Sequence, residues 1–174
     1  VEVVLVDTED RFVKKGLDNI KKTLSEGVAR KLFSEEQTKD ILNHIKGTTN
    51  KDEVKDADFV IEAIFEDIEV KKELFRYLDD ICEERTILAS NTSSFSISEL
   101  ASLLKRADRF VGLHFFYHPA KNRLLEIIPG KNTSIKTINS ANILATLIGK
   151  TAIKVTDSPG FAVNRFFVPW LNEA

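Results

Sequence analysis

Short apolar runs alternate with amphipathic patterns along the chain. Val1–Val6 and Phe59–Ile64 are apolar at nearly every position, which favours strands covered on both faces. The same reasoning predicts further strands at Thr86–Ala89, Phe110–Phe116, Leu124–Ile128 and Ala152–Val155. Between them, apolar residues recur every three or four positions, which predicts helices. Repeated strand–helix alternation indicates an α/β fold with a largely parallel sheet.

Start and stop signals place the helices. Ser34 with Gln37, and Ser96 with Glu99, each form a capping-box pattern at a predicted helix start. Gly149 is predicted to end another helix. Pro129–Gly130 reads as a turn, and Phe161–Ala174 as the start of a last helix. The apolar stripes of the helices are Val13, Leu17, Ile20 and Leu24; Leu74, Phe75, Leu78, Ile81 and Cys82; and Ile135, Ile138, Leu144, Leu147 and Ile148.

Composition narrows the possible functions. The 174 residues carry a net charge of −2 with a pI of about 6.0, which disfavours binding to a nucleic-acid backbone. No apolar run approaches the roughly 20 residues of a membrane span. The single Cys82 excludes an internal disulfide and suits a reducing compartment, so we expect a cytoplasmic protein, or a mitochondrial-matrix protein in a eukaryote. Cys82 lies in a helical apolar stripe, which favours a core role over a reactive thiol.

The chain contains no Met and opens directly on the strand Val1–Val6. We therefore expect a fragment that begins inside a fold. With only seven Gly, it contains no G-x-G-x-x-G phosphate loop.

Ligands of parallel α/β sheets bind at the carboxyl ends of strands, so residues that follow the predicted strands are candidates for a site. Asp7 directly follows the first strand, where a carboxylate can accept hydrogen bonds from both hydroxyls of an adenine ribose. A helix N-cap is an equally good interpretation. Glu66 and Lys71 follow the strand at Phe59–Ile64. Taken alone, each is better read as a solvated charge at a helix start.

Two other features, one in a predicted strand and one after a strand, each allow more than one interpretation. Glu62 lies inside an apolar strand, so it is either an exposed exception or a paired group. Ser90–Ser94 is rich in hydroxyls and amides, but such loops more often form turns than bind ligands. No G-x-S-x-G surrounds these serines, so a hydrolase nucleophile is not indicated.

His114 and Glu126 lie on consecutive apolar strands and can meet across them. A carboxylate on one ring nitrogen fixes the tautomer and leaves the other nitrogen free to take a proton, which describes a general-base dyad. A satisfied His–Glu pair in the core is the alternative. The three histidines show no metal-binding spacing.

Seven segments in order resemble the L-3-hydroxyacyl-CoA dehydrogenase family of fatty-acid β-oxidation. They are Val4–Asp7, Ile61–Glu66, Lys71–Phe75, Ser90–Ser94, Gly112–Phe116, Leu125–Ile128 and Asp157–Arg165. The resemblance implies a Rossmann-type, doubly wound NAD-binding domain at residues 1–158. It also implies that residues 159–174 begin a helical substrate and dimerisation domain, and that a first strand and glycine loop precede Val1. The 174 residues alone are accordingly expected to bind NAD poorly.

The resemblance also implies roles for individual residues. His114 would be the general base and Glu126 its orienting partner, with Ser93 and Asn164 beside the substrate. Contacts to NAD are implied for Asp7, Glu66, Lys71, Asn91 and Ser93, and a contact to coenzyme A for Lys31. The substrate would be an acyl-CoA and the protein a homodimer, and fusion to, or association with, an enoyl-CoA hydratase is a further implication. No nucleic-acid or membrane partner is implied.

One departure from the family pattern leaves alternatives open. Tyr117 stands where the family has an Asn that contacts the cofactor. A sugar-acid dehydrogenase of the same superfamily is one alternative. A catalytically silent nucleotide- or CoA-binding module of a larger protein is another, although His114, Glu126, Ser93 and Asn164 speak against silence, because a pure binder needs no base.

Overall fold

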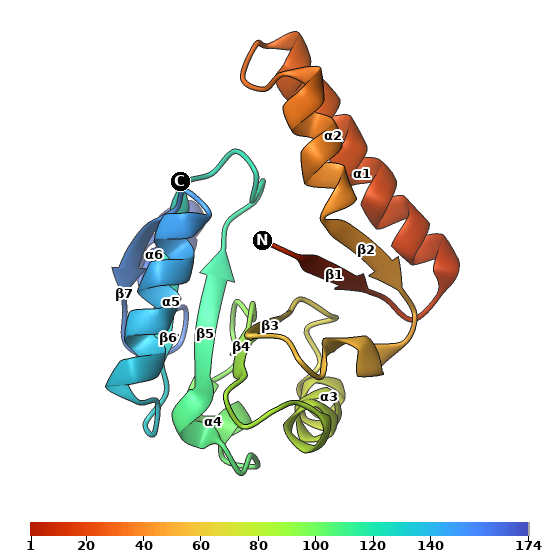
Figure 1. Cartoon of the computed structure of the whole chain (residues 1–174). Coiled ribbons are helices and arrows are strands. Elements are labelled where there is room, and N and C mark those ends of the chain that lie inside the picture. Colours follow the sequence, from red (N-terminus) through yellow and green to blue (C-terminus); the bar gives the residue numbers. More distant parts are fainter. Residues whose placement is uncertain (174) are drawn as a thin grey trace. The chain divides into compact units, whose positions relative to one another are not determined.

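A computed structural model describes residues 1–173, which divide into two compact units (Figure 1). The first unit is Val1–Val54 and the second begins at Lys55. Within residues 1–173, none of the helices has both the length and the apolar character that crossing a membrane requires.

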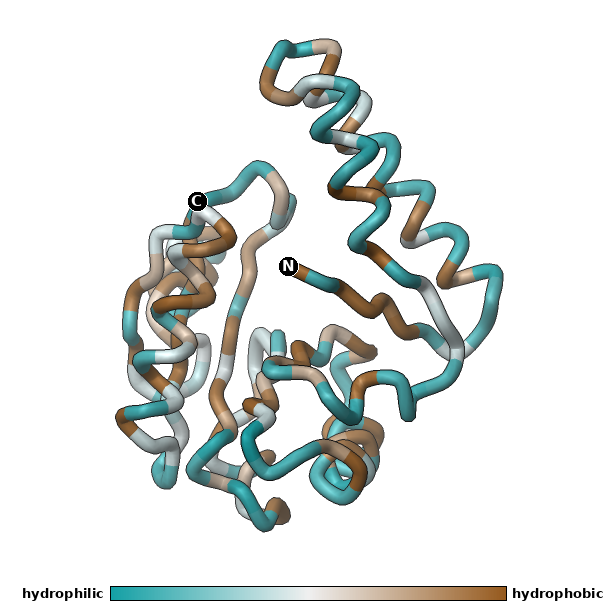
Figure 2. The backbone as a smooth tube through the Cα atoms, viewed as in Figure 1, coloured by the Kyte–Doolittle hydropathy of each residue, from teal (hydrophilic) through white to brown (hydrophobic). Residues whose placement is uncertain are grey.

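The first unit is a two-stranded parallel sheet with two helices. β1 (Val3–Val6) pairs with β2 (Ile45–Thr48), and between them lie α1 (Asp10–Ala29) and α2 (Glu35–Asn43), followed by a 3-10 turn at Lys51–Val54. The predicted capping box of Ser34 and Gln37 begins α2. The prediction that the first strand is covered on both faces is wrong in the described chain, because Val3 and Val4 are 44% and 38% exposed. Figure 2 shows the hydrophobic strand β1 and the alternating hydrophobic and hydrophilic bands of α1.

The second unit is a five-stranded sheet in the order β3-β4-β5-β6-β7. All neighbours are parallel except β5 and β6, so the predicted α/β fold with a largely parallel sheet is confirmed. The strands are β3 (Phe59–Glu62), β4 (Ile87–Ser90), β5 (Phe110–Phe115), β6 (Leu124–Pro129) and β7 (Thr151–Lys154). The helices are α3 (Ile68–Ile81), α4 (Ile97–Ala101), α5 (Ile135–Leu147) and α6 (Val163–Glu173), with a 3-10 turn at Ala107–Arg109.

Alternate residues of β5 point to opposite faces of this sheet. Val111 and Leu113 pack in the core beneath Ala141 and Ala145 of α5. Gly112 points the other way, where an added Cβ would lie 2.8 Å from Ile97 of α4. Helices α4 and α5 therefore cover opposite faces, and His114, two residues after Gly112, shares the face of α4.

The buried face of α5 differs from the prediction. Ile135 and Leu147 of the expected stripe are 77% and 71% exposed, whereas α5 buries Thr137, Ala141 and Ala145. These residues are spaced four apart, so they share one face of the helix. Small side chains there let the helix backbone approach the sheet, which a count of large apolar residues cannot indicate.

The structure also shows where α5 and β6 end. Gly149 has a φ of +70° just beyond α5, a conformation that glycine adopts without a steric penalty, so it ends the helix as predicted. The turn predicted at Pro129–Gly130 begins one residue later, because Pro129 still pairs with Val111 of β5. The pairing of β6 with β7 ends at Ile127, so the missing N–H of Pro129 breaks no ladder on that side. Of the predicted last helix, Ala174 lies outside the described residues.

Candidate functional site

The ends of β5 and β6 bring an imidazole and a carboxylate into contact. His114 and Glu126 are directly opposed in the antiparallel register, so both side chains leave the same face of the sheet. The Nδ1 atom of His114 lies 2.7 Å from Oε2 of Glu126, and the two residues are 4% and 0% exposed. A carboxylate at Nδ1 favours the tautomer in which Nδ1 carries the proton, which leaves the Nε2 lone pair available.

Ser93 lies beside that second nitrogen. Its Oγ atom is 3.1 Å from Nε2 of His114, and the residue is exposed on the turn that follows β4. The free nitrogen therefore faces a hydroxyl that solvent can reach, and the arrangement Glu126–His114–Ser93 can exchange a proton with a bound ligand.

The second oxygen of Glu126 ties this pair to the start of α6. Oε1 accepts hydrogen bonds from the backbone N–H groups of Ala162 at 3.0 Å and Val163 at 2.9 Å. Phe161, which has a φ of +49°, is buried with its ring centroid 5.7 Å from that of His114. One buried carboxylate therefore holds both the histidine ring and the chain segment that leads into α6.

Glu66 organises the turn that carries Ser93. Its Oε1 accepts hydrogen bonds from the Thr92 hydroxyl, from the Ser93 N–H at 2.9 Å, and from the Ser94 N–H and hydroxyl at 3.2 and 2.9 Å. Partial burial raises the pKa of the Glu66 carboxyl, but the hydrogen bonds from Thr92, Ser94 and Ser93 and from Lys71 outweigh it. The pKa therefore lies below its usual value, so the group is an anion at neutral pH.

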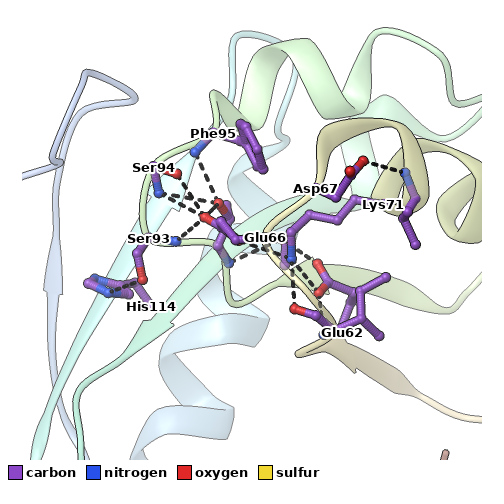
Figure 3. A network of polar contacts seen from close by, with 12 residues as sticks. Glu62, Glu66, Asp67, Lys71, Ser93, Ser94, Phe95 and His114 are labelled. Atoms are coloured by element: carbon purple, nitrogen blue, oxygen red, sulfur yellow. Dashed lines mark hydrogen bonds and ion pairs between the residues drawn. The ribbon is translucent and has the colours of Figure 1, made fainter.

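Lys71 is buried, not solvated as its sequence position alone favours. It is 1% exposed, and its Nζ lies 2.6 Å from Oε1 of Glu62 and 3.2 Å from Oε2 of Glu66 (Figure 3). The question left open for Glu62 is answered here, because Glu62 is a buried, paired group. A network of ionic and polar contacts therefore connects β3 and α3 to the turn after β4.

The other predicted site residues of the second unit lie on separate segments of the chain. Asn91 accepts the Phe115 N–H at its Oδ1 at 2.8 Å, which joins the ends of β4 and β5. Asn164 is half-buried in the first turn of α6, and within residues 1–173 no hydrogen bond joins its side chain to His114 or Ser93. Tyr117 is 93% exposed after β5.

Asp7 and Lys31 belong to the first unit. Asp7 is exposed directly after β1, and its Oδ1 accepts the N–H of Thr8 at 2.7 Å. Lys31 is exposed beyond the end of α1, with a φ of +60°. Residues 1–173 contain no group of three or more His, Cys, Asp or Glu side chains that could hold a metal ion.

Sequence reasoning missed the burial of Lys71 and the hydrogen bonds of Ser90 and Thr92. A signal for Lys71 was present, because it precedes Phe75 by four residues and Leu78 by seven. At that spacing all three lie on one face of α3, and all three are buried. No comparable signal marks Ser90 or Thr92, because their partners are 26 to 28 residues away.

Comparison with known proteins identifies the family of the chain. A family model described as "3-hydroxyacyl-CoA dehydrogenase, NAD binding domain" matches residues 1–158. The chain is 40% identical over 173 residues to a 3-hydroxybutyryl-CoA dehydrogenase of Clostridioides difficile, covering 99% of this chain and 62% of that protein. It is 41% identical over 179 residues to the mitochondrial hydroxyacyl-coenzyme A dehydrogenase of Sus scrofa, covering 99% of this chain and 57% of that one.

Solved structures give the same result. The crystal structure of the (S)-3-hydroxybutyryl-CoA dehydrogenase PaaH1 from Ralstonia eutropha has a TM-score of 0.97 and 40% identity, covering 99% of this chain and 61% of that chain. The chain thus spans about three fifths of the length of these relatives.

Proposed function

Because the chain belongs to the 3-hydroxyacyl-CoA dehydrogenase family, through its NAD-binding domain, we propose that it takes part in oxidising an L-3-hydroxyacyl-CoA to the 3-oxoacyl-CoA. The observation that carries this proposal is the buried dyad of His114 and Glu126, whose free Nε2 faces the Ser93 hydroxyl. A binding module has no need of such a base. The Rossmann-type fold and the cofactor NAD follow from the family itself.

The residues present fit NAD. Asp7 is an exposed carboxylate at the carboxyl end of a parallel strand, where a ribose diol can donate to it. Asn91 and Glu66 follow β4 and β3 at the same end of the second sheet, and we propose them as further residues near the cofactor. When bound, NAD accepts the hydride that leaves C3 of the substrate.

The chain's own residues handle the proton. The Nε2 atom of His114 takes the proton of the C3 hydroxyl, while Nδ1–H donates to Glu126. The negative charge of Glu126, shielded from water, stabilises the imidazolium that forms. Ser93 orients the substrate hydroxyl toward Nε2. Asn164, on the first turn of α6, is proposed to lie beside the acyl group.

The wider setting is also proposed from the family. It comprises a role in fatty-acid β-oxidation or short-chain acyl-CoA metabolism, a homodimer, residues 159–174 as the start of a helical substrate domain, and a coenzyme A contact at Lys31. Among the relatives is a fatty acid oxidation complex subunit alpha of Idiomarina loihiensis, of which the chain covers 24%. Association with an enoyl-CoA hydratase, and a cytoplasmic or mitochondrial location, are further proposals of this kind.

The test is turnover of 3-hydroxybutyryl-CoA with NAD by the protein at its full native length. His114→Gln should lower kcat by about 10²–10⁴-fold, the usual contribution of a general base. His44→Gln, a change at a histidine of the first unit, is the control and should leave kcat unchanged. Wild-type turnover by His114→Gln would show that His114 is not the base.

A further inference from the structure

The buried ammonium group of Lys71 is surrounded by oxygens of its own chain. A lysine ammonium has three N–H donors and no acceptor. Three acceptors surround Nζ: Oε1 of Glu62 at 2.6 Å, Oε2 of Glu66 at 3.2 Å and the carbonyl of Ile64 at 3.4 Å. With 1% of the residue exposed, a cofactor could reach Nζ only by displacing one of these oxygens.

One line of contacts runs from Lys71 through Glu66. Lys71 fixes Oε2 of Glu66, and this leaves Oε1 directed at the turn, where it accepts four hydrogen bonds from Thr92, Ser93 and Ser94. Figure 3 shows Glu66 between Lys71 and the turn, with Ser93 extending on toward His114. Without the ammonium, only Oε1 of the Glu66 carboxylate would be held by hydrogen bonds. The carboxylate could then rotate more freely about its Cγ–Cδ bond.

A second line runs from Lys71 through Glu62. Oε1 of Glu62 accepts from Lys71 and from the Ile64 N–H at 2.7 Å, while Oε2 accepts from the Ser90 hydroxyl at 2.7 Å. The oxygen of that hydroxyl in turn accepts the N–H of Thr92 at 3.2 Å. Both lines therefore reach Thr92, the residue before Ser93.

We propose that Lys71 and Glu62 are positioning residues, which hold the turn at residues 90–94 so that Ser93 lies against His114. This inference rests on the proposed dehydrogenase function for its kinetic consequences, but its structural consequence can be measured without turnover. It gives Lys71 a positioning role beside the cofactor contact that the family resemblance implies.

The test is Lys71→Met in the protein at its full native length, measured by steady-state kinetics and by hydrogen exchange of the Ser93 and Ser94 amides. A displaced Ser93 should lower kcat by about 10- to 100-fold, because small misplacements of positioning groups have effects of this size. The two amides should exchange at least about tenfold faster, because their acceptor is no longer fixed.

Lys72→Met is the matched control. Lys72 is the next residue of the same helix and pairs with Glu69 and Glu99, each at 3.1 Å, so the change removes an equal charge outside the network. It should leave both kcat and amide exchange unchanged.

A second variant keeps the inference testable if Lys71→Met does not fold. Lys71→Met leaves the fully buried carboxylate of Glu62 without its counter-ion, which destabilises a fold strongly, whereas replacing both members of a buried pair is often tolerated. Glu62→Gln with Lys71→Met removes both charges and still frees Glu66, so the same loss of kcat and of amide protection is expected.

The outcomes separate this inference from the proposed function. If Lys71→Met left kcat and amide exchange unchanged and raised only the KM for NAD, Lys71 would serve cofactor binding alone, which would overturn the inference. Unchanged amide exchange in the double variant would overturn it as well. If the wild-type protein does not oxidise 3-hydroxyacyl-CoA, the proposed function fails, and the exchange data still decide the role of Lys71.

Discussion

Replacing Glu126 by Gln should disable the proposed base by changing its tautomer. Glu126 is fully buried and accepts three hydrogen bonds, one from His114 at 2.7 Å and two from the Ala162 and Val163 amides at 3.0 and 2.9 Å. Glutamine has the same shape but only one accepting oxygen. The variant must therefore choose which side keeps an acceptor.

The costs of the two orientations decide that choice. If the glutamine NH2 faced the two backbone amides, both would lose their acceptor, at about 1–3 kcal/mol each. If the oxygen stays with the amides, the NH2 group faces Nδ1 of His114, which then must accept. The ring proton moves to Nε2, which can no longer take a proton from a substrate. The second orientation preserves all three hydrogen bonds and is favoured.

The expected result is a loss of kcat by about 10³–10⁴-fold, equivalent to about 4–5.5 kcal/mol, since a wrong tautomer has effects of this size in other dyads. The free energy of unfolding should change little. Turnover is followed by NADH absorbance, and the protonated ring nitrogen of His114 by ¹⁵N NMR. Glu84→Gln, at an exposed carboxylate, is the control. A variant that keeps Nδ1 protonated and turns over within about threefold of wild type would refute the reasoning.

Three further predictions concern the frame around the site. Gly112→Ala should lower the free energy of unfolding by about 1–3 kcal/mol in denaturant titrations, because the new Cβ would lie 2.8 Å from Ile97 and 2.9 Å from Ile128; an unchanged midpoint would contradict it. Burial raises the pKa of the Cys82 thiol, so a thiol reagent should label it far more slowly in the native than in the unfolded protein, and equal rates would disprove its core position. Burial raises the pKa of Asp157, but hydrogen bonds from residues 96–98 lower it more, so the net pKa is below 3.8. The stability that Asp157 contributes should therefore be complete above its unfolded pKa near 3.8, and be lost as pH falls through the lower folded value. The difference in unfolding free energy between wild type and Asp157→Asn should shrink over that range, and a difference independent of pH would contradict the assignment.

The sequence predicts the pairing of His114 with Glu126 because both are ionisable residues in consecutive apolar strands. Their contact requires only that two consecutive strands pair with each other, and the pattern of apolar runs predicts these two strands. The Lys71 network was not predicted, because it joins Glu62 and Glu66 to Ser90 and Thr92, which lie 26 to 28 residues away in the sequence. The buried face of α5 was mispredicted for a related reason. The distance between helix and sheet selects small residues there, and that distance is a property of the folded packing.

The antiparallel direction of β6 has a consequence for how this site forms during folding. Because β6 runs antiparallel to β5, the late residue His114 and the early residue Glu126 meet after an intervening segment of only 11 residues. A parallel neighbour would have required a crossover of a dozen or more residues, usually a helix, between them. The contact between His114 and Glu126 thus closes only a short loop and can assemble early in folding.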